Sequence, residues 1–202
     1  MKDGPVFEAR RIPSSSRLLP SSFLDWLRDA LPQLLPPHVE GWLRRAFPVW
    51  FLPTRFIVKE TNPAAPDSFY SEGKTYATLQ HLQGRTIPIH YGVAEIEHPG
   101  ETETHKAHLL ELVDGIPLSE CTMEQAIEFR SKEKINEALA LLSEKNIVQG
   151  DPWPRHFIHT PKGELRIIDF GEAYETKNAD ELNRGDASNA ISRVGFRETI
   201  TP

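Results

Sequence analysis

The amino-acid sequence predicts an α+β fold. Segments with strand-like and helix-like hydrophobic spacing follow one another in the order strand, helix, two or three strands, helices and a β-hairpin. Hydrophobic residues make up 39% of the 202 residues and charged residues 26%, which is close to ordinary globular usage. A chain of this size and composition can bury one good-sized core or the cores of two small lobes.

The first 50 residues predict a proline-rich helical extension ahead of this fold. A polar lead-in is followed by a capping box at Ser22 and Asp25, and the helix that starts there ends at Pro32. A second helix is predicted over residues 39–47 from the same apolar spacing. We expect the apolar stripe of both helices to pack on the domain behind them. The alternative is a docking face for a protein partner.

In the rest of the chain, segments with strand-like hydrophobic spacing alternate with segments of helix-like spacing, and turn-forming residues separate them. Residues 55–59 are β-branched and aromatic, as in a strand, and Gly84 stops the helix that follows them. A later helical region has an apolar stripe that comprises Ile135, Ala138, Leu139 and Leu142. The predicted elements are a strand at 55–59, a helix at 67–83, strands at 87–96 and 108–113, a helical region at 123–146, strands at 157–159 and 165–168 that flank a turn, and a last helix at 180–194.

Net charge, cysteine content and hydropathy exclude several classes of function. The formal charge of -6 at pH 7 argues against a nucleic-acid partner, because such proteins need a basic surface to displace counterions from phosphate. Cys121 is the only cysteine, which excludes an internal disulfide and a cysteine-based zinc site. No apolar run resembles a signal peptide or a membrane span, so we expect a soluble protein of the cytoplasm or nucleus with no membrane partner.

Two carboxylates occupy positions that suit phosphoryl transfer. Asp151 lies in a tight loop after a helix, and Asp169 ends the apolar strand at 165–168. The step of 18 residues between them (169 minus 151) is enough for a loop and one hairpin, which would bring the two carboxylates together. Phosphoryl transfer uses such a pair, one to orient the attacking hydroxyl and one to hold magnesium on the phosphates. The alternative for Asp151 is to cap a turn.

With these motifs the chain resembles the protein-kinase-like superfamily. The most similar branch has His-Gly-Asp in its catalytic loop, where this chain has Gln149-Gly150-Asp151, and includes aminoglycoside-phosphotransferase-like and small lipopolysaccharide- or atypical-type kinases. The segment Leu79–Gly84 also resembles kinase-like proteins of filamentous fungi. The resemblance covers roughly residues 56–174. It implies a two-lobed fold with a helical extension at 1–50, an upper lobe at 51–113 and a truncated lower lobe at 114–202.

The resemblance also implies a role for each charged motif. Asp151 matches the catalytic aspartate, and Asp169 matches the magnesium-binding aspartate of Asp-Phe-Gly. Lys59 matches the strand lysine that contacts the nucleotide phosphates, and Glu72 matches the helix glutamate that pairs with that lysine. Taken alone, a surface lysine and a solvated helix glutamate are the alternatives for these last two residues.

Residues 110–113 match the hinge that joins the two lobes of a kinase. At this hinge the resemblance implies that backbone groups around Glu111 and Val113 bind adenine. ATP with Mg²⁺ or Mn²⁺ would then be the cofactors. The acceptor substrate is left open.

Three features depart from the kinase-like pattern. No glycine lies between Gly41 and Gly73, so the glycine-rich loop that normally covers the phosphates is absent before Lys59. His156 stands where relatives carry an asparagine as second magnesium ligand; imidazole tolerates softer cations such as manganese better, and a structural hydrogen bond is its alternative role. Only 31 residues follow Gly171 (202 minus 171), with no Ala-Pro-Glu segment, so no peptide-substrate platform is expected.

Two functions therefore compete on sequence grounds. Retention of all four charged positions favours an ATP-dependent phosphotransferase. Loss of the glycine-rich loop and the histidine exchange favour a pseudokinase that acts as a nucleotide-sensing or protein-binding module. A metal hydrolase is a weaker third reading, because no two histidines have ligand spacing on one helix among His81, His90, His105, His156 and His159.

Overall fold

The computed structural model describes residues 6–10, 52–62, 64–98 and 104–194, with side chains from residue 52 onward. The two predicted N-terminal helices lie outside these residues. The described chain divides into two compact units, one within residues 6–60 and 91–112 and the other within 61–90 and 113–194. The predicted domain boundaries at residues 50 and 113 stay predictions. Antiparallel strands and separate helices make the fold α+β, as predicted.

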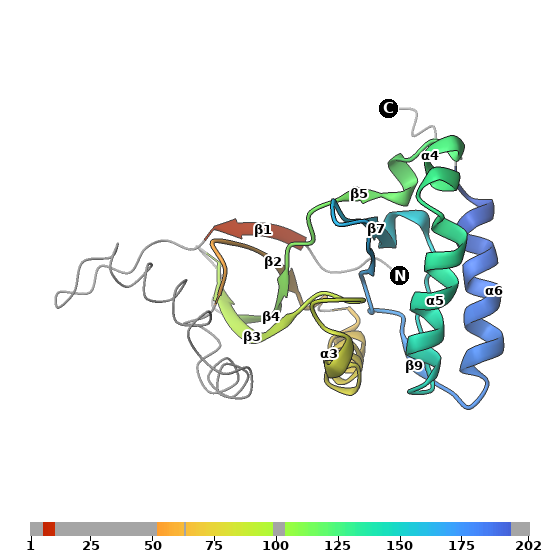
Figure 1. Ribbon diagram of the computed structural model, residues 1–202. Coiled ribbons are helices and arrows are strands. Elements are labelled where there is room, and N and C mark those ends of the chain that lie inside the picture. Colours follow the sequence, from red (N-terminus) through yellow and green to blue (C-terminus); the bar gives the residue numbers. More distant parts are fainter. Residues whose placement is uncertain (1–5, 11–51, 63, 99–103, 195–202) are drawn as a thin grey trace, which may run out of the picture. The chain divides into compact units, whose positions relative to one another are not determined.

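A four-stranded sheet with the order β1-β2-β4-β3 forms one region of the chain (Figure 1). Its strands are β1 (Val6–Arg10), β2 (Arg55–Glu60), β3 (His90–Glu97) and β4 (Thr104–Glu111). Strand β2 runs antiparallel to both β1 and β4. The strand prediction at 55–59 is confirmed, and those at 87–96 and 108–113 are confirmed with shifted ends. Strand β1 was not predicted, because the sequence at this point predicts only a polar lead-in.

The sheet buries a small apolar core of its own. This core comprises Leu52, Phe56, Val58 and Ala107. Phe56 and Val58 alternate along β2, as the period of two in a strand requires for residues that share a face. The alternation fixes which β2 side chains face the core, since a one-residue slip would turn Phe56 and Val58 away from it.

Helix α3 (Pro66–Thr78) precedes β3 and buries a face that includes a charge. Pro66 lies in the first turn, where its missing N–H costs nothing. The buried positions are Phe69, Glu72, Thr75 and Tyr76. The helix was predicted to run to Gln83, but it ends at Thr78 and a 3-10 turn (Gln80–Leu82) completes the segment. A helical stripe that contains a buried glutamate indicates a specific partner for that carboxylate.

Three further helices are α4 (Met123–Glu128), α5 (Ser131–Ser143) and α6 (Ala179–Ser192), and α5 and α6 lie side by side (Figure 1). The predicted helical region at 123–146 is divided at Arg130, which has a left-handed backbone with φ of 52°. The apolar stripe on α5 is confirmed, because all four predicted residues are buried. Among the described helices, none has both the length and the hydropathy that crossing a bilayer would require.

Short strands complete the C-terminal part of the chain. The predicted hairpin forms from β7 (Phe157–His159) and β8 (Leu165–Ile167), and β5 (Ile116–Pro117) pairs with β7. Strand β6 (Ile147–Val148) pairs antiparallel with β9 (Tyr174–Glu175). These pairings bring the segment before Asp151 beside the segment after Asp169.

Candidate functional site

The loop that carries Asp151 depends on a glycine directly before it. Gly150 follows β6 with a φ of +82°, in the left-handed region that L side chains rarely adopt. A Cβ atom at this position would lie 2.2 Å from the backbone oxygen of Glu172. The backbone of the two loops therefore approaches so closely that only glycine fits.

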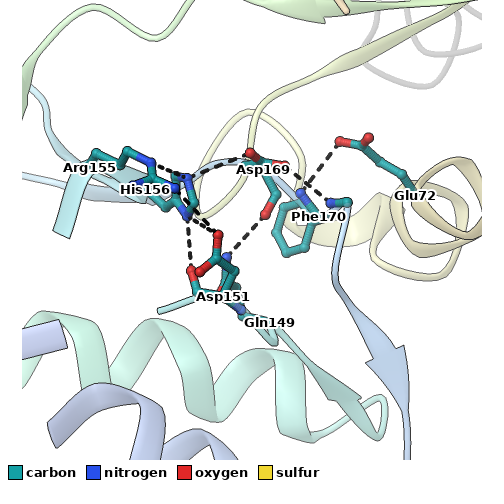
Figure 2. A network of polar contacts seen from close by, with 8 residues as sticks. Glu72, Gln149, Asp151, Arg155, His156, Asp169 and Phe170 are labelled. Atoms are coloured by element: carbon teal, nitrogen blue, oxygen red, sulfur yellow. Dashed lines mark hydrogen bonds and ion pairs between the residues drawn. The ribbon is translucent and has the colours of Figure 1, made fainter. Parts of the chain in front are cut away.

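Gln149 ties the two carboxylate-bearing loops together. Its side chain is fully buried, its Nε2 donates to the backbone oxygen of Asp169 at 3.1 Å, and its Oε1 accepts the N–H of Asp151 at 2.8 Å. The backbone N–H of Gln149 donates in turn to Oδ1 of Asn183 on α6 at 3.3 Å. One amide side chain thus sets the spacing between the backbones of Asp151 and Asp169 (Figure 2).

Asp169 has a strained backbone and an ordered carboxylate. Its φ of 61° places it in the left-handed region, where aspartate is better tolerated than most residues because its short side chain bonds locally. Here Oδ1 accepts the backbone N–H of Gly171 at 3.2 Å. That bond leaves Oδ2 directed toward His156, whose Nε2 lies 3.6 Å away.

His156 lies between the two aspartates, as the sequence-based assignment of a shared site requires (Figure 2). The ring is 4% exposed. Its Nδ1 lies 2.9 Å from the backbone oxygen of Asp151 and 3.5 Å from Oδ2 of the same residue. The three predicted residues Asp151, His156 and Asp169 therefore form one cluster.

The partners of His156 decide its tautomer. A backbone carbonyl only accepts hydrogen bonds, so Nδ1 carries the proton that it donates to Asp151. Arg155 donates its Nε–H to Nε2 of His156 at 3.1 Å, so Nε2 carries a lone pair. With these partners the proton lies on Nδ1, and Nε2 accepts from Arg155 on the side where Asp169 lies.

Helix α3 is bonded to the Asp-Phe-Gly segment at two points. Oε1 of Glu72 accepts the backbone N–H of Phe170 at 3.4 Å, and Oγ of Ser68 donates to the backbone oxygen of Gly171 at 2.8 Å. The Phe170 ring packs edge-on against Tyr76, with ring centres 5.3 Å apart. Glu72 is 2% exposed, so this backbone N–H helps to compensate a buried carboxylate.

The remaining predicted residues lie in or next to the sheet. Lys59 is a buried residue of β2, 7% exposed, opposite His108 in the pairing with β4. Glu111 ends β4 opposite Phe56, and Val113 follows it as a half-buried residue. Lys59 and Glu72 belong to different units, so their ion pair stays a prediction, as do the roles of Glu111 and Val113.

Sequence reasoning missed a carboxylate that supports the Asp151 loop. Asp186 on α6 is a partly buried carboxylate near the backbone N–H of Gly150. Burial raises the pKa of Asp186 above its ordinary value and the charge of Asp151 raises it further, whereas the Gly150 backbone N–H and the Arg193 guanidinium lower it. No periodicity marks a residue of this kind, because its role depends on a contact 36 positions away along the chain (186 minus 150).

Two arginine guanidinium groups lie near the ring of Trp153, an aromatic residue that follows Asp151 closely in the chain. Trp153 is half-buried, and the guanidinium carbons of Arg155 and Arg193 lie 5.3 Å and 4.3 Å from its ring centre. Both distances are within the range of cation–π attraction. Nη2 of Arg155 also lies 3.7 Å from Oδ2 of Asp151. Trp153 and both arginines were not among the residues predicted from the sequence.

The cluster offers few donors to a metal ion. Within the described ranges no group of three or more His, Cys, Asp or Glu side chains is arranged to hold one. Asp169 and His156 provide one oxygen and one nitrogen on facing side chains. Magnesium in nucleotide sites usually takes one or two protein carboxylates and completes its shell with phosphate oxygens and water. This donor set fits a metal that arrives with a nucleotide, and it does not fit a metal held by protein alone.

Comparison with known families agrees with this arrangement. The family model described as lipopolysaccharide core biosynthesis protein (WaaY) matches residues 90–196, which are 107 of the 202 residues. The chain belongs to this family. Since the family is protein-kinase-like, the superfamily resemblance is confirmed at that level and supports a phosphotransferase of kinase-like fold. The match includes Asp151, His156 and Asp169 but begins after Lys59 and Glu72.

A curated relative covers more of this chain. The meiotic driver SPOK2 of Podospora anserina is 24% identical over an alignment of 189 positions, which covers 84% of this chain. The chain spans only 23% of that protein's length, about a quarter of it. The similarity is to a fungal protein and concerns one part of a much longer chain.

Proposed function

We propose that the chain is an ATP-dependent phosphotransferase with a two-lobed kinase-like fold, in which Asp151 acts on the acceptor. The observation that carries the proposal is the single cluster of Asp151, His156 and Asp169, held by Gln149. The family match over the same residues supports it.

Asp151 orients an acceptor hydroxyl and takes its proton. The hydroxyl oxygen forms a bond to the γ-phosphorus of ATP as the bond from that phosphorus to the ADP oxygen breaks. Arg155, with Nη2 3.7 Å from Oδ2 of Asp151, restricts the rotamers of that carboxylate. Lys59, Glu72 and the backbone near Glu111 and Val113 bind the nucleotide.

Asp169 and His156 would hold Mg²⁺ or Mn²⁺, which supplies positive charge to the phosphate oxygens. The Nε2 lone pair of His156 is engaged by Arg155, so metal binding through this nitrogen requires Arg155 to move away. Because imidazole suits manganese better than magnesium, we expect Mn²⁺ to support ATP binding better than Mg²⁺.

A thermal-shift titration tests the proposal, because a ligand that binds only the folded protein raises its melting temperature. We expect ATP with Mn²⁺ to raise the melting temperature more than ATP with Mg²⁺. His156→Asn should remove the difference between the two metals. Asp151→Asn should keep the ATP shift but abolish phosphate transfer to any acceptor that the wild-type protein phosphorylates. An unchanged melting temperature with ATP and either metal would refute nucleotide binding.

One observation favours the alternative, a pseudokinase that serves as a nucleotide-sensing or protein-binding module. Arg155 already occupies the acceptor nitrogen of the imidazole and lies near the Asp151 carboxylate, so both groups have a partner without a metal. The similarity to one part of the meiotic driver SPOK2 also suits a module within a longer protein. ATP binding that is identical with and without divalent metal would support this alternative.

A further inference from the structure

The Trp153 cluster, made of Trp153, Arg155 and Arg193, has no role in the function proposed so far beyond the contact of Arg155 with Asp151. Its two guanidinium groups lie within 5.3 Å and 4.3 Å of one indole ring. They come from different elements, since Arg155 belongs to the 3-10 turn Pro154–His156 and Arg193 caps the C-terminus of α6. Two segments distant in sequence thus place positive charge at the same aromatic side chain.

Each arginine of the Trp153 cluster has a carboxylate as its neighbour. The protein has a formal net charge of -6, and the carboxylates of Asp151, Asp169 and Asp186 belong to the same group of loops and helix. Two like charges near one ring repel each other unless an anion or a nearby carboxylate compensates them. Arg155 has Asp151 as its neighbour, and Arg193 interacts with Asp186.

The donors of Arg193 remain available to a ligand. Over the part of the chain that the structure describes, its guanidinium stacks on Trp153 and feels the charge of Asp186, and no hydrogen-bond acceptor takes its N–H groups. A guanidinium that uses its face for an aromatic ring keeps its edge for hydrogen bonds, and this edge matches the geometry of phosphate and carboxylate oxygens.

The backbone of Trp153 is also held rigidly. Trp153 stands between Pro152 and Pro154, both of which fix their φ angles. The backbone N–H of Trp153 donates to the backbone oxygen of Asp151 at 2.8 Å, and the N–H of His156 donates to the oxygen of Trp153 at 2.9 Å. A rigid platform loses little entropy when a ligand binds, so its position relative to Asp151 can determine which acceptors react.

We propose that the Trp153 cluster is the acceptor subsite and that it binds an anionic group, phosphate or carboxylate, on the molecule whose hydroxyl is phosphorylated. The inference rests on the proposed phosphotransferase function and names its substrate class. The edge of Arg193 binds the anion, Trp153 contacts the carbon skeleton, and Arg155 lies between this anion and Asp151. The acceptor is thus a hydroxylated compound that already carries negative charge.

Ligand-observed NMR titrations of the whole chain, without nucleotide or metal, test this subsite. The probes are glycerol 3-phosphate, glycerate and glycerol, which share a hydroxylated three-carbon skeleton and differ in charge. We expect both anions to bind and glycerol not to bind, with the phosphate binding more tightly than the carboxylate. Arg193→Gln should weaken anion binding about tenfold, the effect of losing one charge-assisted hydrogen bond. Arg193→Lys should restore part of the affinity, since it keeps the charge but loses the planar fork.

Arg184→Gln is the matched control, because Arg184 also lies on α6 but is exposed and pairs with Asp180. It should bind both anions as the wild type does. Equal affinity in Arg193→Gln and Arg184→Gln, or no anion binding by the wild type, would overturn the proposal. Competition between glycerol 3-phosphate and ATP would also overturn it, by assigning the arginines to the nucleotide phosphates.

Failure of the subsite and failure of the phosphotransferase function give different results. If ATP with Mn²⁺ raises the melting temperature of the wild type and of Arg193→Gln equally while no anion binds, nucleotide binding stands and the subsite is wrong. If the anions bind through Arg193 and ATP has no effect, the anion site stands and the acceptor role is wrong.

Discussion

The carboxylate-bearing loops and the four-stranded sheet place their candidate functional residues by different physical means. Lys59 on β2 is positioned by a regular ladder of backbone hydrogen bonds and by the alternation that buries Phe56 and Val58. Asp151 and Asp169 have no such ladder, and single side chains and close backbone contacts position them instead. The comparison teaches that one substitution should disrupt the loops, whereas the sheet should tolerate comparable changes.

Gly150→Ala should have the largest effect. A Cβ there would lie 2.2 Å from the oxygen of Glu172, so the two loops must separate, and we expect a loss of about 4 kcal/mol in the free energy of unfolding. Gly163→Ala is the matched control, because Gly163 has a similar φ of +76° but no atom within 4 Å of the added Cβ. It should cost only about 1 kcal/mol. Urea denaturation measures both, and equal losses would show that backbone strain alone matters at Gly150.

Gln149→Met should have the next largest effect. Methionine fills a similar volume but leaves the N–H of Asp151 and the oxygen of Asp169 without their partner. Two partly buried groups that lose their hydrogen bonds should cost about 3 kcal/mol. Urea denaturation gives the stability, and the ATP thermal shift should fall as well. A variant of wild-type stability would show that water or another side chain takes over both bonds.

A buried histidine outside the cluster should make stability depend on pH. Burial lowers the pKa of His159 from 6.5 to about 4, and the charge of Lys134 lowers it further. Between these values the unfolded chain binds a proton that the folded chain does not, so stability is complete above pH 6.5 and falls as the pH drops toward 4. We expect this group to account for a loss of about 3 kcal/mol.

Urea denaturation at several pH values measures this effect. His159→Gln should flatten the dependence between pH 6.5 and 4. His81→Gln should leave it unchanged, because His81 is exposed. Equal pH profiles for His159→Gln and the wild type would mean that His159 is protonated in the folded protein.

The smallest expected effect is the coupling between Lys59 on β2 and Glu72 on α3, which belong to different units. If Lys59 and Glu72 form the predicted ion pair, a double-mutant cycle with Lys59→Met and Glu72→Gln should give a coupling energy of about 1 kcal/mol or more. The exposed pair Lys74 and Glu175, at 3.3 Å, is the control and should give less than about 0.5 kcal/mol. Additive effects of the Lys59 and Glu72 substitutions would remove the kinase-like assignment of this pair.

The elements that the sequence predicts best are those whose own residues, through apolar spacing or turn-forming residues, determine their structure. The α5 stripe from Ile135 to Leu142 is buried as expected, and the hairpin around Thr160–Gly163 forms where its turn residues stand. Strand β1 was missed because backbone pairing with β2, rather than an apolar pattern of its own, defines it. The two-residue strands β5, β6 and β9 are likewise defined by partners distant in sequence.

Some residues of the candidate site could be predicted from the sequence, and others could not. Asp151, His156 and Asp169 were found because short motifs mark them, and the structure brings these three together. The clamp by Gln149 and the support from Asn183 and Asp186 could not be predicted, since each depends on side-chain bonds between segments whose proximity only the fold creates.

The bond between Glu72 and the Phe170 amide has a consequence for hydrogen exchange. Phe170 lies outside every helix and strand, a position at which amides usually exchange with solvent quickly. Its N–H is nevertheless held by a carboxylate of α3, and the N–H of neighbouring Ile168 is held by the oxygen of His156. Exchange at these amides requires α3 or the Asp151 loop to detach, so it reports the free energy of that opening. The segment with the least regular structure should therefore be among the slowest to exchange.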